Sequence, residues 1–171
     1  MPFTALFMEK PPSTRITGLP LIGIDIDDTI ADWAEEPPYE AYPSPYAQNV
    51  LRRWIVEETM QILYITSRPR ERRSETETWL RQNRFPHPDR VLYEEDSVGG
   101  KPATLRKLGA PGLIDDMPST QSVAAAEGLL AFWRDIPKNQ RFTAPPPHEN
   151  LIPWKNWLEL DQLVREKISF Q

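Results

Sequence analysis

Short apolar runs alternate with helical segments along most of the chain. The apolar runs predict buried strands at 19–26, 61–66, 90–93, 112–115 and 129–133. Helices are predicted from about residue 46, and at 67–83, 101–109, 119–128 and 154–168. Each parallel pair of strands needs a helical crossover. The order therefore predicts an α/β fold, with a Rossmann-like parallel sheet of about five strands and flanking helices.

Proline-rich segments interrupt this pattern in a chain that holds 19 prolines. Residues 1–18, which include two of them at 11–12, predict an irregular N-terminal arm. Residues 33–46 contain four prolines, three acids and four aromatic residues, which predicts a long loop without strand or helix. We expect one domain over 19–171, with 31–47 as a loop or minimal cap over the site. Residues 136–171 would supply a proline-rich link and the C-terminal helix.

The composition excludes several classes of function. The chain has 171 residues, 39% of them hydrophobic, which suits one domain with a full core. It has no cysteine, so disulfides, thiolate metal sites and cysteine catalysis are excluded. Its two histidines, His87 and His148, lie far apart, so a histidine-rich zinc site is not expected. The net charge of −5 disfavours nucleic acid, unless a local basic patch or a metal ion offsets it.

The sequence predicts no contact with a membrane. No apolar stretch approaches the roughly 20 residues that a membrane span requires. The N-terminus lacks the charged region and long apolar run of a signal peptide. We therefore expect a cytoplasmic protein, and the sequence carries no signal for an oligomeric state.

Polar residues follow the predicted strands at the positions where ligands bind in open α/β sheets. The first strand runs into Asp25, Asp27 and Asp28, the second into Thr66-Ser67, and the fourth into Asp115-Asp116. Carboxylates that converge in one cleft repel each other, and a divalent cation with oxygen ligands relieves that repulsion. Lys101, at a predicted helix start, adds the positive charge that a metal–phosphate site needs.

Each of these features also has a purely structural interpretation. Acids after a strand commonly serve turns, and Thr66-Ser67 alone would be a helix cap. Lys101 alone would be a solvated surface lysine, and Asp115-Asp116 a loop turn. All four features occur in order, each at its own strand end or helix start, and this favours a functional site.

The four motifs resemble those of the haloacid dehalogenase-like (HAD) hydrolases over about residues 19–135. Asp28 stands where the first motif usually has glycine. The resemblance implies a HAD-like core. About 40 residues separate Asp25 from Thr66 and 35 separate Thr66 from Lys101, which leaves no room for a large cap domain.

The resemblance also implies a role for each motif residue. Asp25 would attack phosphorus and become a phosphoaspartate, and Asp27 would act as general acid and then as base. An acid at position 27 favours phosphoryl transfer over dehalogenation. Thr66 and Lys101 would hold the transferring oxygens. The implied Mg²⁺ ligands are Asp25, Asp27 through its carbonyl, Asp115 and Asp116, and Thr29 would steady the loop that carries Asp25.

Softer similarities indicate a small phosphorylated substrate, with a nucleotide favoured. Residues 151–157 resemble the tail of 5′(3′)-deoxyribonucleotidases, and 65–69 and 78–80 resemble their bacterial relatives. We expect substrate to contact Thr29, Ser67, Arg68 and Trp33. The aromatic residues of the loop, Trp33, Tyr39, Tyr42 and Tyr46, either stack on a base or anchor the loop to the core.

Three alternatives stay open at the level of sequence. Arg68, Arg70, Arg72 and Arg73 would suit a nucleic-acid end, as in the 3′-phosphatase half of polynucleotide kinase-phosphatases. Glu71, Glu75 and Glu77 would instead neutralise them on a solvated helix face. A small-metabolite phosphatase, for a sugar phosphate for example, would have the same motifs. A non-catalytic binding module is the least favoured, because no motif residue is lost.

Overall fold

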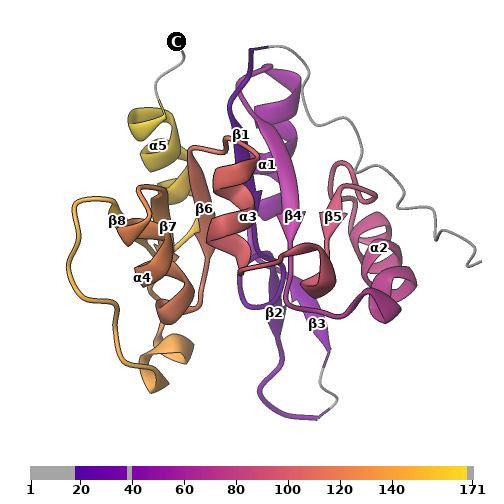
Figure 1. Ribbon diagram of the computed structural model, residues 1–171. Helices are drawn as coiled ribbons and strands as arrows, with labels where there is room; N and C mark the ends of the chain where they lie inside the picture. Colours follow the sequence, from indigo (N-terminus) through magenta and orange to yellow (C-terminus); the bar gives the residue numbers. More distant parts are fainter. Residues whose placement is uncertain (1–17, 38–39, 169–171) are drawn as a thin grey trace, which may run out of the picture.

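A six-stranded parallel sheet forms the middle layer of the protein (Figure 1). The computed structural model describes residues 18–37 and 40–168. The strands follow the order β5-β4-β1-β6-β7-β8, and every neighbouring pair is parallel. Their bounds are β1 Leu21–Ile24, β4 Gln61–Ile65, β5 Val91–Leu92, β6 Gly112–Asp115, β7 Leu130–Arg134 and β8 Leu151–Trp154. The predicted α/β class, with a Rossmann-like parallel sheet and flanking helices, is confirmed.

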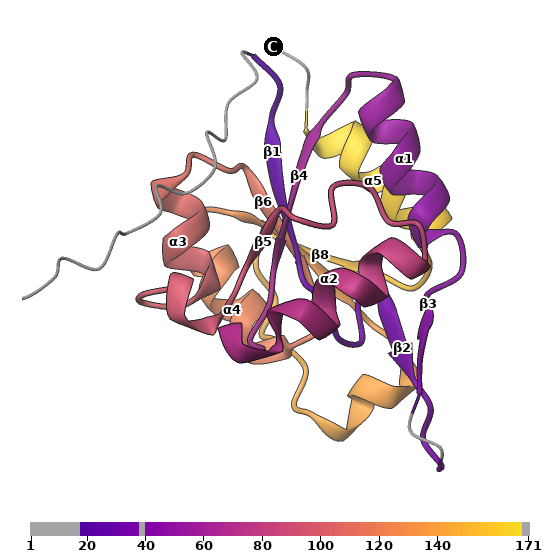
Figure 2. The same ribbon diagram turned by 90° about the vertical axis from the view of Figure 1, so that its right-hand side faces the viewer.

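Helices cover both faces of the sheet. Figure 2 shows α3 and α4 on one side and α1 and α5 on the other. The helices are α1 Ala47–Val56, α2 Arg73–Gln82, α3 Lys101–Lys107, α4 Pro118–Ala126 and α5 Trp157–Lys167. Three short 3₁₀ turns add η1 Arg70–Arg72, η2 Glu94–Asp96 and η3 Pro137–Arg141.

The strands bury both of their faces, which explains their continuous apolar runs. In β4, Ile62 packs in the cluster that includes Trp54 of α1 and Trp157 of α5, whereas Leu63 packs in the cluster that includes Leu105 of α3. Neighbouring residues point to opposite faces of a strand, so each run contributes to two cores at once.

The C-terminal segment contains a sixth strand that the sequence analysis missed. Residues 136–153 were expected to be an irregular link, but β8 pairs with β7 along the edge of the sheet. Pro153 lies within β8, opposite Trp133. An edge strand tolerates proline, because only one side of its backbone needs to pair. Proline therefore misled the prediction here.

The segment after β1 is also more regular than predicted. Ala31–Trp33 (β2) and Ala41–Pro43 (β3) form an antiparallel ribbon, so the prediction of a loop without strands is wrong. Figure 1 shows this hairpin extending beyond the carboxyl ends of the sheet strands. Pro43 ends β3, where it interrupts little of the ladder. Tyr39 and residues 1–17 of the predicted arm lie outside the described residues.

Three helices begin later or differently than predicted. The helix expected from Ser67 begins as η1 at Arg70 and as α2 at Arg73. The helix predicted to begin at residue 119 begins one residue earlier, at Pro118, so Ser119 lies inside its first turn. The last helix begins at Trp157, where the Asn156 side chain accepts from the Glu159 N–H at 3.0 Å. Within the described residues, no helix is long and apolar enough to cross a membrane.

Helix α3 approaches the central strand closely because β1 has a glycine at position 23. A Cβ at Gly23 would lie 2.4 Å from Cδ1 of Leu105, well inside van der Waals contact. Leu105 is fully buried in α3, the helix that begins with Lys101. The small residue in β1 thus helps to set the distance between Lys101 and the residues that follow β1.

Gly23→Ala is expected to lower the free energy of unfolding by about 1–3 kcal/mol, because the added methyl group overpacks the core. Urea denaturation followed by circular dichroism measures the loss. Leu105→Ala removes the overlapping side chain, so the double variant should lose less stability than the sum of the two single variants. Strictly additive losses would contradict this close contact.

Candidate active site

Sheet topology brings the predicted motif residues to one edge of the sheet. The central strand β1 lies between β4 and β6, so the residues at the carboxyl ends of these three strands are neighbours. Asp25 extends the ladder, because its N–H donates to the Ile114 carbonyl at 2.9 Å. Thr66 follows β4, and Asp115 ends β6.

A buried ion-pair cluster forms at this edge. Lys101 Nζ lies 2.6 Å from Oδ1 of Asp25 and 2.7 Å from Oδ2 of Asp115. The other oxygen of Asp25 accepts a hydrogen bond from Thr29 Oγ1 at 3.0 Å. All four residues are buried. Both oxygens of Asp25 therefore have a donor, and the carboxylate is held in one orientation.

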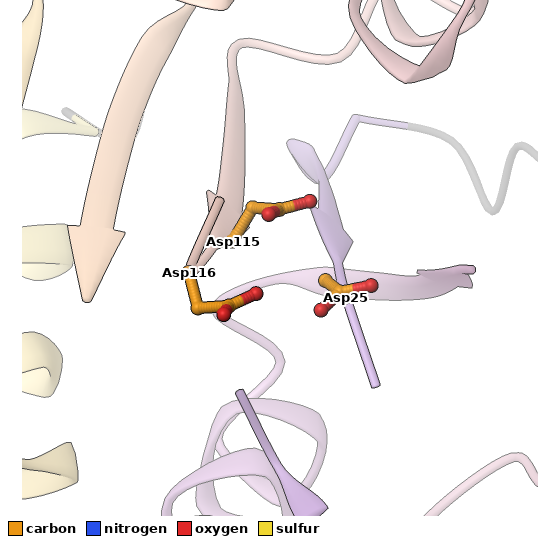
Figure 3. A group of neighbouring side chains, drawn as sticks. All are labelled: Asp25, Asp115 and Asp116. Atoms are coloured by element: carbon orange, nitrogen blue, oxygen red, sulfur yellow. The ribbon is translucent and has the colours of Figure 1, made fainter. Parts of the chain in front are cut away.

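Three carboxylates at this edge form a set that suits a divalent cation. Asp25, Asp115 and Asp116 each offer one oxygen, and these atoms lie within 4.8 Å of one another. Figure 3 shows the three side chains converging from the ends of β1 and β6. An all-oxygen donor set is what Mg²⁺ prefers. These three residues would hold the ion, and the side chain of Asp27 is not part of the set.

The acids of this cluster are buried and carry more negative charge than Lys101 can neutralise, and both effects raise the pKa values of two of them. Burial raises the pKa of Asp25 to about 7; the charges of Asp115 and Asp27 add to the rise, and Lys101 opposes it. Burial also raises the pKa of Asp116 to about 8, with a contribution from Asp25. Burial tends to lower the pKa of Lys101, but Asp115 and Asp25 outweigh it and raise that pKa. A bound cation would supply the missing charge, so the residues present fit a metal site.

Side chains from β7 and α4 fix the loop that carries Asp115 and Asp116. The Met117 N–H donates to Oδ1 of Asp115 at 2.8 Å, and Trp133 Nε1 donates to the Asp116 carbonyl at 3.1 Å. Gln121 Nε2 reaches the Asp115 carbonyl at 3.3 Å and is fully buried. The sequence analysis missed Trp133 and Gln121. The available signal was a lone amide at helical spacing from the buried Ala124 and Ala125.

Asp27 is engaged by two residues that were expected to bind substrate. Arg68 donates to both of its oxygens, from Nε at 2.8 Å and from Nη2 at 2.5 Å. Trp33 Nε1 donates to the same carboxylate at 2.8 Å. Burial tends to raise the pKa of Asp27, but the hydrogen bonds and charge of Arg68 outweigh it and lower that pKa. In this conformation, Arg68 and Trp33 orient a carboxylate of the site.

The hairpin β2–β3 is fastened to the body by a second ionic network. Arg134 Nη1 lies 2.7 Å from the Asp28 carbonyl and 2.5 Å from Oδ1 of Asp32, and its Nη2 lies 2.8 Å from Ser44 Oγ. Lys138 Nζ lies 2.5 Å from Oδ1 of Asp28. Asp28 has a φ of 57°, the left-handed region that favours glycine and tolerates aspartate. Arg134 and Lys138 did not stand out in the sequence, because they lie more than 100 residues from the aspartates that they contact.

The arginines that follow Thr66 are paired with acids. Arg72 pairs with Glu75 at 2.5 Å and Arg73 with Glu77 at 2.7 Å, as the helix-face interpretation predicted. Arg70 pairs with Asp96 of η2. Their charge is therefore largely neutralised within the protein, which weakens the case for a nucleic-acid end.

Mg²⁺ is expected to raise the melting temperature more at pH 8 than at pH 6. The raised pKa values of Asp25 and Asp116 mean that, without a cation, the contribution of these two groups to the free energy of unfolding is full below about pH 4. It is lost as the pH rises through about 7 and 8. A cation stabilises the ionised carboxylates and so opposes this loss.

Thermal melts in EDTA and in MgCl₂ at both pH values measure the effect. Asp116→Asn should remove most of the Mg²⁺ increment, and Asp89→Asn, a change at an exposed acid in another loop, should keep it. Equal Mg²⁺ increments at pH 6 and pH 8 in the unaltered chain would contradict the prediction.

Comparisons with individual proteins include one curated protein and one solved structure. A Bacillus cereus protein described as "Putative nucleotidase" is 25% identical over 130 residues, which cover 74% of this chain and 62% of that protein. The match thus spans less than two thirds of the relative's length. A solved Vibrio cholerae structure, described as a "putative 3-deoxy-D-manno-octulosonate 8-phosphate phosphatase", has a TM-score of 0.49 at 14% identity, covering 90% of this chain and 89% of that one.

The third comparison is with models of protein families. The model described as "PITM 1-3, LNS2 domain" matches residues 22–112, just over half of the chain. This range starts in β1 and includes Asp25, Thr66 and Lys101, three of the residues at the site. The chain therefore belongs to the family of LNS2 domains that this model describes.

Proposed function

We propose that this chain is a Mg²⁺-dependent phosphohydrolase that acts through a phosphoaspartate on Asp25. The observation that carries the proposal is the buried Asp25 carboxylate, held between Lys101 and Thr29 beside a set of three converging acids. A fixed, partly desolvated carboxylate next to a lysine and a metal site suits nucleophilic attack on a phosphate ester. The similarity to a protein described as a nucleotidase supports the same class of reaction.

The reaction has two displacement steps at phosphorus. A carboxylate oxygen of Asp25 bonds to phosphorus, the bond to the ester oxygen breaks, and that oxygen takes a proton from Asp27. Water then attacks the phosphoaspartate and gives a proton to Asp27. This attack releases inorganic phosphate and restores Asp25. Lys101 and Thr66 hold the transferring oxygens. Asp25, Asp115, Asp116 and the Asp27 carbonyl would hold Mg²⁺, which would supply charge neutralisation to the phosphate.

Asp27 needs a change of partners before it transfers a proton. Arg68 and Trp33 occupy both of its oxygens, and its lowered pKa disfavours the protonated form. A substrate phosphate is an alternative anionic partner for Arg68. Substrate binding would thus free Asp27 and give Arg68 a role in holding substrate, as the sequence analysis expected.

Nucleotides are the substrates that we propose. The relative described as a nucleotidase supports this choice. The ion pairs of Arg70, Arg72 and Arg73 argue against the longer backbone of a nucleic-acid end. Tyr42 and Tyr46 are 53% and 56% exposed, so either ring is accessible to a base. Sugar phosphates share the same chemistry and belong in the same assays.

Asp25→Asn is expected to lower Mg²⁺-dependent phosphate release from nucleoside 5′-monophosphates by about a thousandfold or more, because the amide is not a nucleophile. A malachite-green assay measures the rate, and circular dichroism checks that the fold is intact. Asp89→Asn serves as the matched control and should keep the rate of the unaltered chain. Turnover in Asp25→Asn equal to that of the unaltered chain would overturn the proposed role of Asp25, whereas no phosphate release from the unaltered chain would favour a binding module.

Asp27→Asn is expected to slow the hydrolysis of nucleoside monophosphates by about 10²–10⁴-fold, which is the usual contribution of a positioned acid–base group. The first step with p-nitrophenyl phosphate should suffer less, because nitrophenolate leaves without a proton. A rapid burst of about one equivalent of nitrophenolate, followed by slow turnover, would report intact attack by Asp25 and impaired hydrolysis. Equal losses in the first step for both esters would exclude Asp27 as the acid.

A further inference from the structure

A pocket adjoins the proposed phosphate site on the side of α3 and α4. It has a volume of about 470 Å³, within the range of small-molecule sites, and opens between η2 and the first turns of these two helices. Thr66 and Lys101 are part of its wall. Lys101 Nζ lies 2.6 Å from Asp25, so a phosphate at Asp25 would share a wall with this pocket. The group attached to that phosphate is thus within reach of it.

Hydroxyl groups dominate the polar lining of this pocket. Five lining residues carry one, namely Thr66, Ser67, Ser97, Ser119 and Thr120. The side-chain hydroxyls of the last four have no hydrogen-bond partner among the described residues, and Oγ of Ser97 is also buried. A buried hydroxyl without a partner is costly, so a ligand or water is expected to satisfy it. Ser122, one turn further along α4, instead donates to the Pro118 carbonyl at 3.0 Å.

The arginines and aromatic residues near the site do not line the pocket. Of the residues that line it, Lys101 and Glu94 are the charged ones and none is aromatic. A second phosphate would meet Glu94 rather than an arginine, and a base would find no ring to stack on. Hydroxyl groups donate and accept at once, and so match the hydroxyls of a sugar. The lining therefore selects a neutral, polyhydroxylated group.

We propose that this pocket binds the sugar of the phosphorylated substrate through Ser97, Ser119 and Thr120, while the phosphate lies at Asp25. The proposal rests on the phosphohydrolase function and names the part of the substrate that is recognised. That sugar is either the pentose of a nucleotide or a free sugar phosphate. In both cases the base contributes little to selection, because it lies outside the pocket.

The test compares kcat/KM for sugar-containing esters with that for p-nitrophenyl phosphate, which has no sugar hydroxyl. The substrates are adenosine and cytidine 5′-monophosphates and ribose 5-phosphate. Each of three variants is expected to lower the kcat/KM for a sugar ester, relative to that for the nitrophenyl ester, by about three- to tenfold, as for one lost hydrogen bond. These variants are Ser97→Ala, Ser119→Ala and Thr120→Val. Ser122→Ala, whose hydroxyl bonds within its own helix, should leave the ratio unchanged.

The outcomes separate this proposal from the one on which it rests. Similar kcat/KM for the two nucleotides, with lower ratios in the three variants, supports sugar recognition. Ribose 5-phosphate hydrolysed as well as the nucleotides would identify a free sugar phosphate, and slower hydrolysis would identify the nucleotide. Unchanged ratios in all three variants would overturn the sugar pocket while leaving the phosphohydrolase intact. Hydrolysis that survives Asp25→Asn would overturn the proposed attack by Asp25, and no hydrolysis of any ester by the unaltered chain would overturn the phosphohydrolase itself.

Discussion

The buried contact of Lys101 with Asp25 and Asp115 is the interaction on which the site depends. Three carboxylates converge at the end of β1 and β6, and Lys101 is the cation that reaches two of them. Burying like charges together is unfavourable unless a cation compensates them. The fold meets this demand through Gly23, which admits α3 close to β1 and so sets Lys101 beside Asp25. Lys101 does not contact the third carboxylate, Asp116, and this uncompensated negative charge explains why a divalent ion fits there.

A second set of ion pairs joins the hairpin β2–β3 to the same edge of the sheet. Arg134 and Lys138 hold Asp28 and Asp32, whereas Arg68 and Trp33 hold Asp27. The acids of this segment are thus fixed from different parts of the chain. The hairpin is thus fastened to the body of the protein, and the proposed sugar pocket lies beside α3 and α4.

The arginines after Thr66 suggested a nucleic-acid substrate and the aromatic residues suggested stacking on a base. The contacts that these side chains make within the protein weaken both interpretations. The arginines after Thr66 form ion pairs with Glu75, Glu77 and Asp96. Trp33 donates to Asp27, which gives the ring a structural partner. Most residues that line the pocket are instead small or hydroxylated, and among them only Thr66, Ser67 and Lys101 were predicted from the sequence to bind substrate or act in catalysis.

The sequence by itself determined the class of fold, five of the six sheet strands and the motif residues of the site. It did so because apolar runs and strand-end acids are local signals. It missed β8 and the hairpin β2–β3, because prolines obscure strands whose pairing depends on distant residues. Only the tertiary structure decided which cation faces which acid. Those contacts join residues up to 110 positions apart, as between Asp28 and Lys138, and no local pattern specifies them.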